Sequence, residues 1–181
     1  MGDYYSRKPA QNVVLNDLIC GCIMGGAIGD AFGYPIRSMK YDEIKQKYGD
    51  NGITAFDVSN GFSQISDNTQ MMLYTANAIV REKTKRLLDG HSMGLQHYIR
   101  RAYDNWHSSM TSQEKNLLKT PEKLCWIYNV DIFRAARTSG NTSSDTVVKK
   151  NNTESNGIKD CGRLIPVAPI GCFFWCTRET V

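Results

Sequence analysis

Polar side chains and small residues occur together at three loop-to-helix junctions of this sequence, at residues 29–35, 65–70 and 137–142. In the second junction Ser66, Asp67 and Asn68 stand in succession and offer a hydroxyl, a carboxylate and an amide carbonyl. These hard oxygen donors are the ligands that Mg²⁺ and Ca²⁺ prefer, so the triplet is a candidate metal site. The same residue types also cap helix N-termini, and the local pattern by itself favours that structural role.

Glycines recur at every fourth position of the stretch before the first junction, at Gly21, Gly25 and Gly29. Each costs roughly 1 kcal/mol in helix propensity, so a helix that carries three of them on one face must use that face. Close packing of a neighbouring helix is the favoured use. Close approach of the backbone to a ligand is the alternative.

The elements that position these residues are expected to be helices. A first helix should run from Asn12 or Asn16 to Phe32 and end where Gly33 supplies backbone freedom before Pro35. A short surface helix is expected over residues 41–48. The next helix should run from Asp67, as a cap paired with Gln70, to about Leu88. One face of it should carry Met72, Ala76, Ile79 and Lys83.

Two more helices are expected further along the chain. Ser92 can cap a helix with a core-facing stripe formed by Leu95, Ile99, Ala102 and Trp106. Thr120 and Pro121 can open another helix toward Arg134, and residues 138–160 have the composition of a long exposed loop. No long stretch alternates as a strand would, so the sequence predicts an all-α protein.

Composition narrows the classes of protein. The chain has 181 residues, 41% of them hydrophobic and 22% charged, which predicts one folded domain and excludes a wholly disordered protein. Residues 1–11 should form a flexible N-terminal tail and residues 12–181 the folded part. The net charge of +4 is too small to indicate a nucleic-acid partner.

The six cysteines have no zinc-finger spacing and are expected to be reduced and mostly buried. The most apolar run has about 12 residues, fewer than the roughly 20 that a membrane-spanning helix needs, so we expect no membrane partner. Without a recognisable signal peptide, the expected location is cytoplasmic.

Four motifs, in order, resemble the ADP-ribosylglycohydrolase family, which includes the dinitrogenase-reductase-activating glycohydrolases. GGAIGDAFGYP at 25–35 is similar to the family's opening helix and loop, and ISDNTQM at 65–71 to its S/T-D-D-T-x-M metal motif. RTSGNT at 137–142 and CGRLIPVAPIG at 161–171 resemble two later family segments. The resemblance covers roughly residues 17–174.

The resemblance implies an all-α, orthogonal multi-helix bundle that holds two Mg²⁺ ions beside ADP-ribose and hydrolyses the bond joining the ribose to a protein side chain. Ser66, Asp67 and Asn68 then correspond to metal ligands, and Asp67 is the best catalytic candidate, although the sequence assigns no catalytic residue. The matching motifs place the following residues beside the substrate: Gly29, Asp30, Gly33, Gly140, Asn141 and Gly162.

Departures from the family pattern concern the charge of the site. Asn68 replaces a second Asp, which should lower metal affinity, and Arg37 stands where many members have Glu. A guanidinium cannot act as a base or as a metal ligand. Pro166 replaces an Arg, and the second metal motif, D-x-D-T, has no counterpart in this sequence. The resemblance is therefore to the N-terminal part of the family domain, and we expect the bundle to be incomplete.

Two functions follow from the resemblance and these departures. The first is the family's Mg²⁺-assisted hydrolysis, impaired or lost in this chain. The alternative is a non-catalytic module that binds ADP-ribose or a protein on the same scaffold. The expected partners are ADP-ribose or an ADP-ribosylated protein, and apolar surface around Val167–Trp175 should favour self-association.

Overall fold

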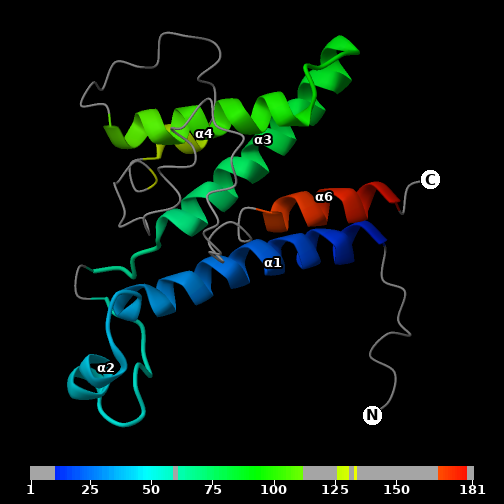
Figure 1. The fold of residues 1–181 in the computed structure, drawn as a ribbon. Helices are drawn as coiled ribbons and strands as arrows, with labels where there is room; N and C mark the ends of the chain where they lie inside the picture. Colours follow the sequence, from blue (N-terminus) through cyan, green and yellow to red (C-terminus); the bar gives the residue numbers. More distant parts are fainter. Residues whose placement is uncertain (1–10, 59–60, 112–125, 131–132, 134–166, 179–181) are drawn as a thin grey trace, which may run out of the picture.

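The computed structural model describes residues 11–58, 61–111, 126–130, 133 and 167–178. Its elements are α1 (Gln11–Gly33), η1 (Tyr34–Ile36), α2 (Tyr41–Tyr48), α3 (Asp67–Asp89), α4 (Leu95–Thr111), η4 (Trp126–Asn129) and α6 (Ala168–Arg178). Helix α3 contacts α1, α4 and α6, and α6 lies beside α1 (Figure 1). The described residues contain no strand, so the all-α prediction is confirmed.

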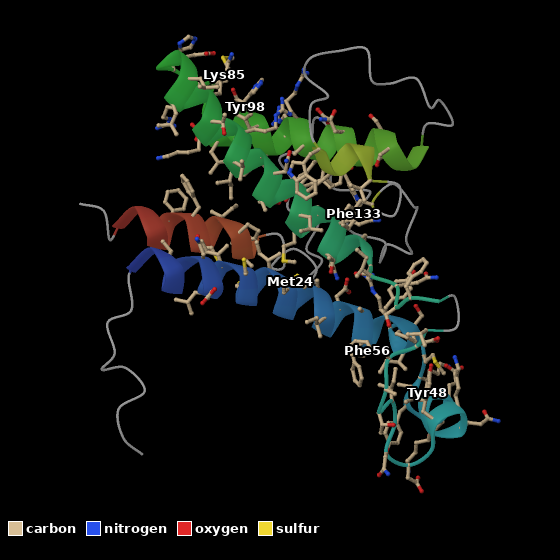
Figure 2. All side chains as sticks on the ribbon, turned by 180° about the vertical axis from the view of Figure 1, so that it is seen from behind. Met24, Tyr48, Phe56, Lys85, Tyr98 and Phe133 are labelled. Atoms are coloured by element: carbon tan, nitrogen blue, oxygen red, sulfur yellow. The ribbon has the colours of Figure 1, made fainter. Side chains whose placement is uncertain are left out.

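Helix α1 extends over the predicted range and ends where Pro35 enters the short helix η1. Gly33 has φ −82° and ψ −17°, an ordinary right-handed conformation, so the expectation that its special backbone freedom ends the helix was wrong. The Phe32 and Phe56 rings pack edge to face with centroids 5.3 Å apart. This contact holds the segment after α2 against the end of α1 (Figure 2).

Helix α3 begins as predicted, but its cap is Ser66 rather than Asp67. The Ser66 Oγ accepts a hydrogen bond from the Asn68 N–H at 3.1 Å, and Asp67 is the first helical residue. Gln70 does not complete the expected capping box with Asp67, because its Oε1 accepts a bond from Trp106 Nε1 at 3.1 Å. Gln70 therefore binds Trp106 in the core instead of the N-terminus of α3.

The C-terminal half of α3 is joined to the start of α4 by a buried carboxylate. Glu82 is only 2% exposed, accepts a hydrogen bond from the Ser92 Oγ at 2.6 Å and forms an ion pair with Arg86. Ser92 therefore does not cap α4 as predicted: α4 begins at Leu95, and Ser92 fixes the preceding loop to α3.

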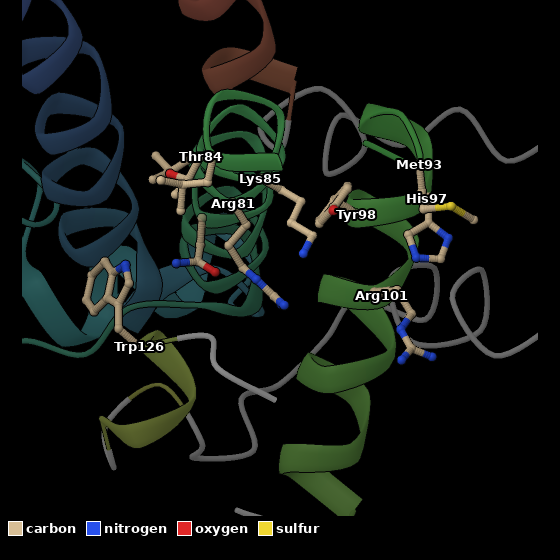
Figure 3. A pocket seen from close by; sticks show the side chains of 11 residues that line it. Arg81, Thr84, Lys85, Met93, His97, Tyr98, Arg101 and Trp126 are labelled. Carbon is tan, nitrogen blue, oxygen red and sulfur yellow. The ribbon is translucent and has the colours of Figure 1, made fainter. Parts of the chain in front are cut away.

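A cavity of about 540 Å³ lies between these two helices (Figure 3). Its walls include the side chains of Arg81, Lys85, Arg101, Tyr98 and Trp126. None of the described residues predicted to bind metal or substrate lines it. Asn77, its lining residue nearest to Asp67 in sequence, lies about 15 Å further along the α3 axis, given a rise of about 1.5 Å per residue.

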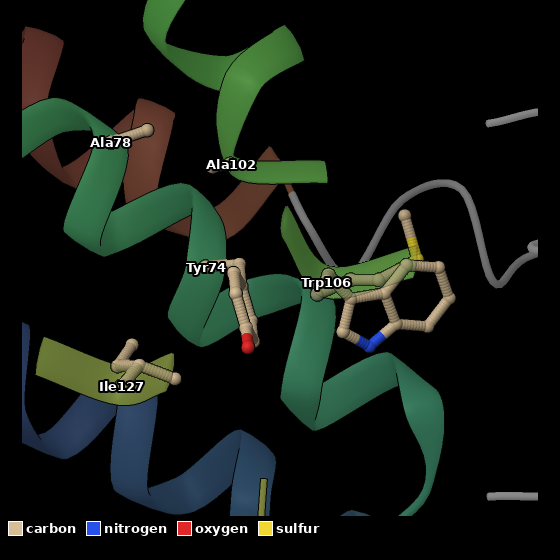
Figure 4. Packing of buried hydrophobic residues seen from close by; sticks show 6 residues of the cluster. Tyr74, Ala78, Ala102, Trp106 and Ile127 are labelled. Carbon is tan, nitrogen blue, oxygen red and sulfur yellow. The ribbon is translucent and has the colours of Figure 1, made fainter. Parts of the chain in front are cut away.

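The hydrophobic core lies where α3, α4 and η4 meet. Trp106 and Tyr74 are fully buried, and Ile127, Ala78 and Ala102 pack with them (Figure 4). The stripe predicted for α4 is confirmed at three of its four residues: Ala102 and Trp106 are core residues, and Ile99 packs against the same cluster. Leu95 is half-buried and lies outside the described cluster.

The face predicted for α3 is only partly correct. Met72 and Ile79 are buried, but Lys83 is exposed, and the residues that join the core cluster are Met71, Tyr74 and Ala78. Helix α3 contacts neighbours on several sides, so its first half is buried nearly all round and a single amphipathic stripe does not describe it.

Much of the surface of α1 and α6 is apolar and exposed. Met24 and Ile28 of α1 are 59% and 52% exposed, and at α6 Val167 and Phe174 are 48% and 55% exposed. The expected apolar surface near Val167 is present, while self-association stays a prediction. Cys20 and Cys22 are also exposed, so the expectation of mostly buried thiols is wrong for these two.

The segment Leu15–Ile36 is long and apolar enough to cross a membrane by length and composition, and only 6% of it is buried. The apolar stretch is therefore longer than the 12-residue run that the sequence suggested. Core helices of soluble proteins and signal sequences also pass this test. The absence of a membrane partner stays a prediction. The predicted helix over 120–134 falls mostly outside the described residues, as does the loop at 138–160.

The Ser92 to Glu82 bond leads to a first prediction. Ser92→Ala should destabilise the protein by about 1.5 kcal/mol at neutral pH, because a buried carboxylate loses a hydrogen bond. The Ser92 hydroxyl is the strongest cause of the lowered pKa of Glu82; burial opposes it, and Arg86 lowers it further. The native contribution is therefore lost as the pH falls through this lowered pKa, and the gap between native and variant should close in acid.

Urea unfolding at neutral and acidic pH measures this gap. Ser38→Ala, the same change at an exposed serine, is the control and should leave stability unchanged. A Ser92→Ala deficit that persists undiminished in acid would argue against the ionised Glu82 as the partner.

Candidate functional site

The carboxylate of Asp30 joins the end of α1 to the start of α3. Its Oδ1 accepts a hydrogen bond from the Ser66 Oγ at 2.7 Å. Its Oδ2 accepts bonds from the Ser66 backbone N–H at 2.8 Å and from the Thr69 Oγ1 at 2.6 Å. Asp30 does lie in the predicted site, but both of its oxygens are engaged with protein groups. Its observed contacts are those of a positioning residue, and contact with a substrate stays a prediction.

Ser66 is held by two of these bonds and by its role as the α3 cap. It is fully buried, and its hydroxyl donates to Asp30 while it accepts from the Asn68 N–H. A hydroxyl has one proton and two lone pairs, so one lone pair is left after these bonds. Of the three predicted metal ligands, Ser66 therefore has the least capacity to bind a cation.

Asp67 is a buried carboxylate with an arginine beside it. Its side chain is 0% exposed, and its Oδ1 forms an ion pair with Arg37 Nη1 at 2.8 Å. The Arg37 side chain is 29% exposed and approaches from the turn after η1. The sequence identified Arg37 only as a departure from the family pattern. Nothing in the local sequence could reveal a contact between residues 30 positions apart.

Two buried oxygens at this helix start have no hydrogen-bond partner among the described residues: Asp67 Oδ2 and Asn68 Oδ1. Buried polar atoms are normally satisfied by protein, water or a bound ion, so these two oxygens are the candidate ligands for an external group. Both belong to the triplet singled out from the sequence, which the structure brings together with Asp30 and Arg37.

The donor set decides how well a metal ion would fit. Mg²⁺ is usually held by one or two carboxylates and keeps several waters. Asp67 Oδ2 and Asn68 Oδ1 offer one carboxylate oxygen and one amide oxygen toward a single ion. The described residues contain no group of three or more His, Cys, Asp or Glu side chains that could hold a metal. They therefore offer no cage for two ions, and the binding of one ion stays a prediction.

Glycines of α1 leave the backbone open beside this cluster. A Cβ added at Gly21, Gly25, Gly29 or Gly33 would meet no neighbouring atom within 4 Å among those described, whereas one at Gly26 would lie 3.5 Å from Met72 Sδ. The expectation that Gly21, Gly25 and Gly29 allow close helix packing is wrong for the described part of the chain. Gly29 and Gly33 flank Asp30 with open backbone, as the alternative required.

Comparison with known proteins decides the family. The chain matches the family model for ADP-ribosylglycohydrolase over residues 11–181. This chain belongs to the ADP-ribosylglycohydrolase family. Searches of curated proteins and of solved structures gave no match. The family assignment confirms the resemblance carried by residues 25–35 and 65–71, the two motifs that the structure places together. Gly140, Asn141 and Gly162, predicted from the two later motifs, lie outside the described residues of this ADP-ribosylglycohydrolase-family chain.

Asp30→Asn should destabilise the fold by about 2 kcal/mol, because an amide offers one acceptor oxygen where three donors now meet a carboxylate. Asp17→Asn makes the same change at an exposed position of α1 and is the matched control. Urea unfolding of both variants measures the difference. Equal stabilities for the two variants would contradict the positioning role of Asp30.

Proposed function

We propose that this chain binds an ADP-ribosyl group, free or attached to a protein, where α1 meets the start of α3. The observation that carries the proposal is the pair of unsatisfied buried oxygens, Asp67 Oδ2 and Asn68 Oδ1, in a member of this family. The open backbone at Gly29 and Gly33 supports it, because phosphate and ribose can approach a surface without side chains.

Any cation that joins the substrate at this site would be weakly held, because only Asp67 of its two ligands carries a charge. Asp67 Oδ2 and Asn68 Oδ1 are the donors that would hold one Mg²⁺, and such an ion orients ribose hydroxyls and lowers the pKa of a bound water. Asp67 is the first residue of α3, where the helix dipole favours a negative charge.

The same geometry supports impaired hydrolysis. Cleavage of a glycosidic bond ordinarily uses two carboxyl groups, one as acid and one as base or nucleophile. Both oxygens of Asp30 accept hydrogen bonds from the start of α3, and the amide of Asn68 cannot act as an acid or a base at neutral pH. Asp67 Oδ2 is the one carboxylate oxygen of the described cluster that is left for proton transfer. A site with one available carboxylate is better suited to binding ADP-ribose than to hydrolysing its bond.

The second candidate function is a non-catalytic module that binds ADP-ribose or a protein. The ion pair between Arg37 and Asp67 favours it, because a carboxylate that is already paired with a guanidinium is less available to a metal ion. Turnover by the native chain distinguishes the two functions, since both include binding.

Binding can be tested with a pair of glycine variants. Gly29→Ala and Gly21→Ala lie on the same open face of α1, so each should stabilise the helix by roughly 0.5–1 kcal/mol. Only Gly29→Ala should weaken ADP-ribose binding, by about tenfold or 1.4 kcal/mol, because its methyl group enters the site. Calorimetric titration with ADP-ribose, and with AMP as a comparison ligand, measures both affinities. No binding to the native chain, or equal losses in both variants, would contradict the proposal.

Hydrolysis is tested by restoring the missing charge. We expect millimolar Mg²⁺ to leave the Tm of the native chain unchanged and expect little or no release of ADP-ribose from Arg-linked or Ser-linked protein substrates. Asn68→Asp should raise the rate at least tenfold and make Tm respond to Mg²⁺, because a ligand that binds only the folded state stabilises it. Asn16→Asp makes the same change at an exposed position of α1 and is the control. A clear Mg²⁺-dependent rise in the native Tm would show that the native cluster is already competent.

A further inference from the structure

Arg37 occupies an unusual place beside the candidate cation ligands. Its Nη1 lies 2.8 Å from Asp67 Oδ1, and the second oxygen of the same carboxylate is one of the two buried acceptors without a partner among the described residues. The guanidinium and any cation bound at Asp67 Oδ2 therefore share one carboxylate.

The two partners differ in their freedom to move. Asp67 is 0% exposed and lies in the first turn of α3, next to Ser66, whose three polar contacts fix it. Arg37 is 29% exposed and follows η1 on the surface, so its side chain is the less enclosed of the two partners. The carboxylate is the buried partner of the pair, and the guanidinium reaches it from the surface.

A buried carboxylate requires a positive partner, and two positive partners on one carboxylate repel each other. Arg37 supplies a positive charge that is part of the chain, is present at every ordinary pH and needs no loss of hydration from a metal. A divalent cation at Asp67 must either displace Arg37 or tolerate it a few ångströms away.

We propose that Arg37 is a built-in cation that takes the charge-balancing role of a metal at Asp67 and so sets the divalent-cation affinity of the cluster. Removal of its charge converts Asp67 Oδ2 and Asn68 Oδ1 into a divalent-cation site. The inference rests on the proposed function, which assigns these two oxygens as the cation ligands. Arg37 touches Asp67 rather than the reacting atoms, so it is a positioning and specificity residue.

The test uses the full chain and Mg²⁺ alone, with no substrate. Arg37→Gln removes the charge and keeps a polar side chain, and Arg37→Lys keeps the charge as the matched control. We expect Arg37→Gln to bind Mg²⁺ at least tenfold more tightly than the native chain and Arg37→Lys to resemble the native chain. Calorimetric titration gives the affinities, and Mn²⁺ followed by electron paramagnetic resonance gives an independent count of bound ions.

The response of the Tm to Mg²⁺ distinguishes the proposed role of Arg37 from a merely structural one. Without metal, Arg37→Gln should have a lower Tm, because Asp67 is left buried without its counter-ion. Mg²⁺ should restore that loss in Arg37→Gln and leave the Tm of Arg37→Lys unchanged. The double variant Arg37→Gln with Asp67→Asn should show no Mg²⁺ response. If Arg37→Gln is unfolded without metal, circular dichroism with and without 10 mM Mg²⁺ is the readout, and recovery of helix is expected.

Equal Mg²⁺ affinities for the native chain and Arg37→Gln would overturn the inference, as would a response that survives Asp67→Asn or a variant that stays unfolded with Mg²⁺. ADP-ribose titration of the native chain separates this failure from failure of the proposed function. Binding that depends on Gly29, without a Mg²⁺ response in Arg37→Gln, would leave the proposed function standing and remove only the role of Arg37.

Discussion

The carboxylate of Asp30 is the constraint on which the site depends. Three donors from the start of α3 converge on it within 2.8 Å, and they include both the backbone and the side chain of the cap residue Ser66. The position of Ser66 fixes where α3 begins, and that start determines where Asp67 and Asn68 present their oxygens. An aspartate near the end of one helix thus places the candidate ligands on another helix.

The same joint controls the charge of the site. Because α1 ends three residues after Asp30 and leads directly into η1, the turn that carries Arg37 is held beside the first turn of α3. Arg37 can therefore reach Asp67. The local balance is one carboxylate satisfied by hydrogen bonds, one carboxylate paired with a guanidinium, and one neutral amide. This balance leaves the cluster little negative charge with which to hold a divalent cation.

Features set by neighbours in the sequence could be predicted, and features set by distant partners could not. Pro35 and the apolar spacing in α4 act within a few residues, so α1 was found close to its observed bounds and α4 close to its observed start. Ser66 took the cap of α3 because Asp30, 36 residues earlier, holds its hydroxyl.

Gln70 and Ser92 likewise bind distant partners in place of the predicted local ones. Gln70 accepts a hydrogen bond from Trp106, and Ser92 donates one to Glu82. The site triplet was found from donor chemistry and family resemblance. Its electrostatic partner Arg37 required the three-dimensional structure.

The glycines of α1 show how packing and ligand approach can be separated. A glycine inside a helix lowers stability by roughly 0.5–1 kcal/mol relative to alanine, so its presence calls for a compensating use. A Cβ at Gly26 would lie 3.5 Å from Met72 Sδ, which is ordinary van der Waals contact, so packing among the described residues does not require a glycine there. Gly29 has no neighbour within 4 Å among the described residues, and it directly precedes Asp30 in the helix. Packing in the described part of the chain therefore explains neither glycine, and the open backbone of Gly29 is what a bound ribose or phosphate would require.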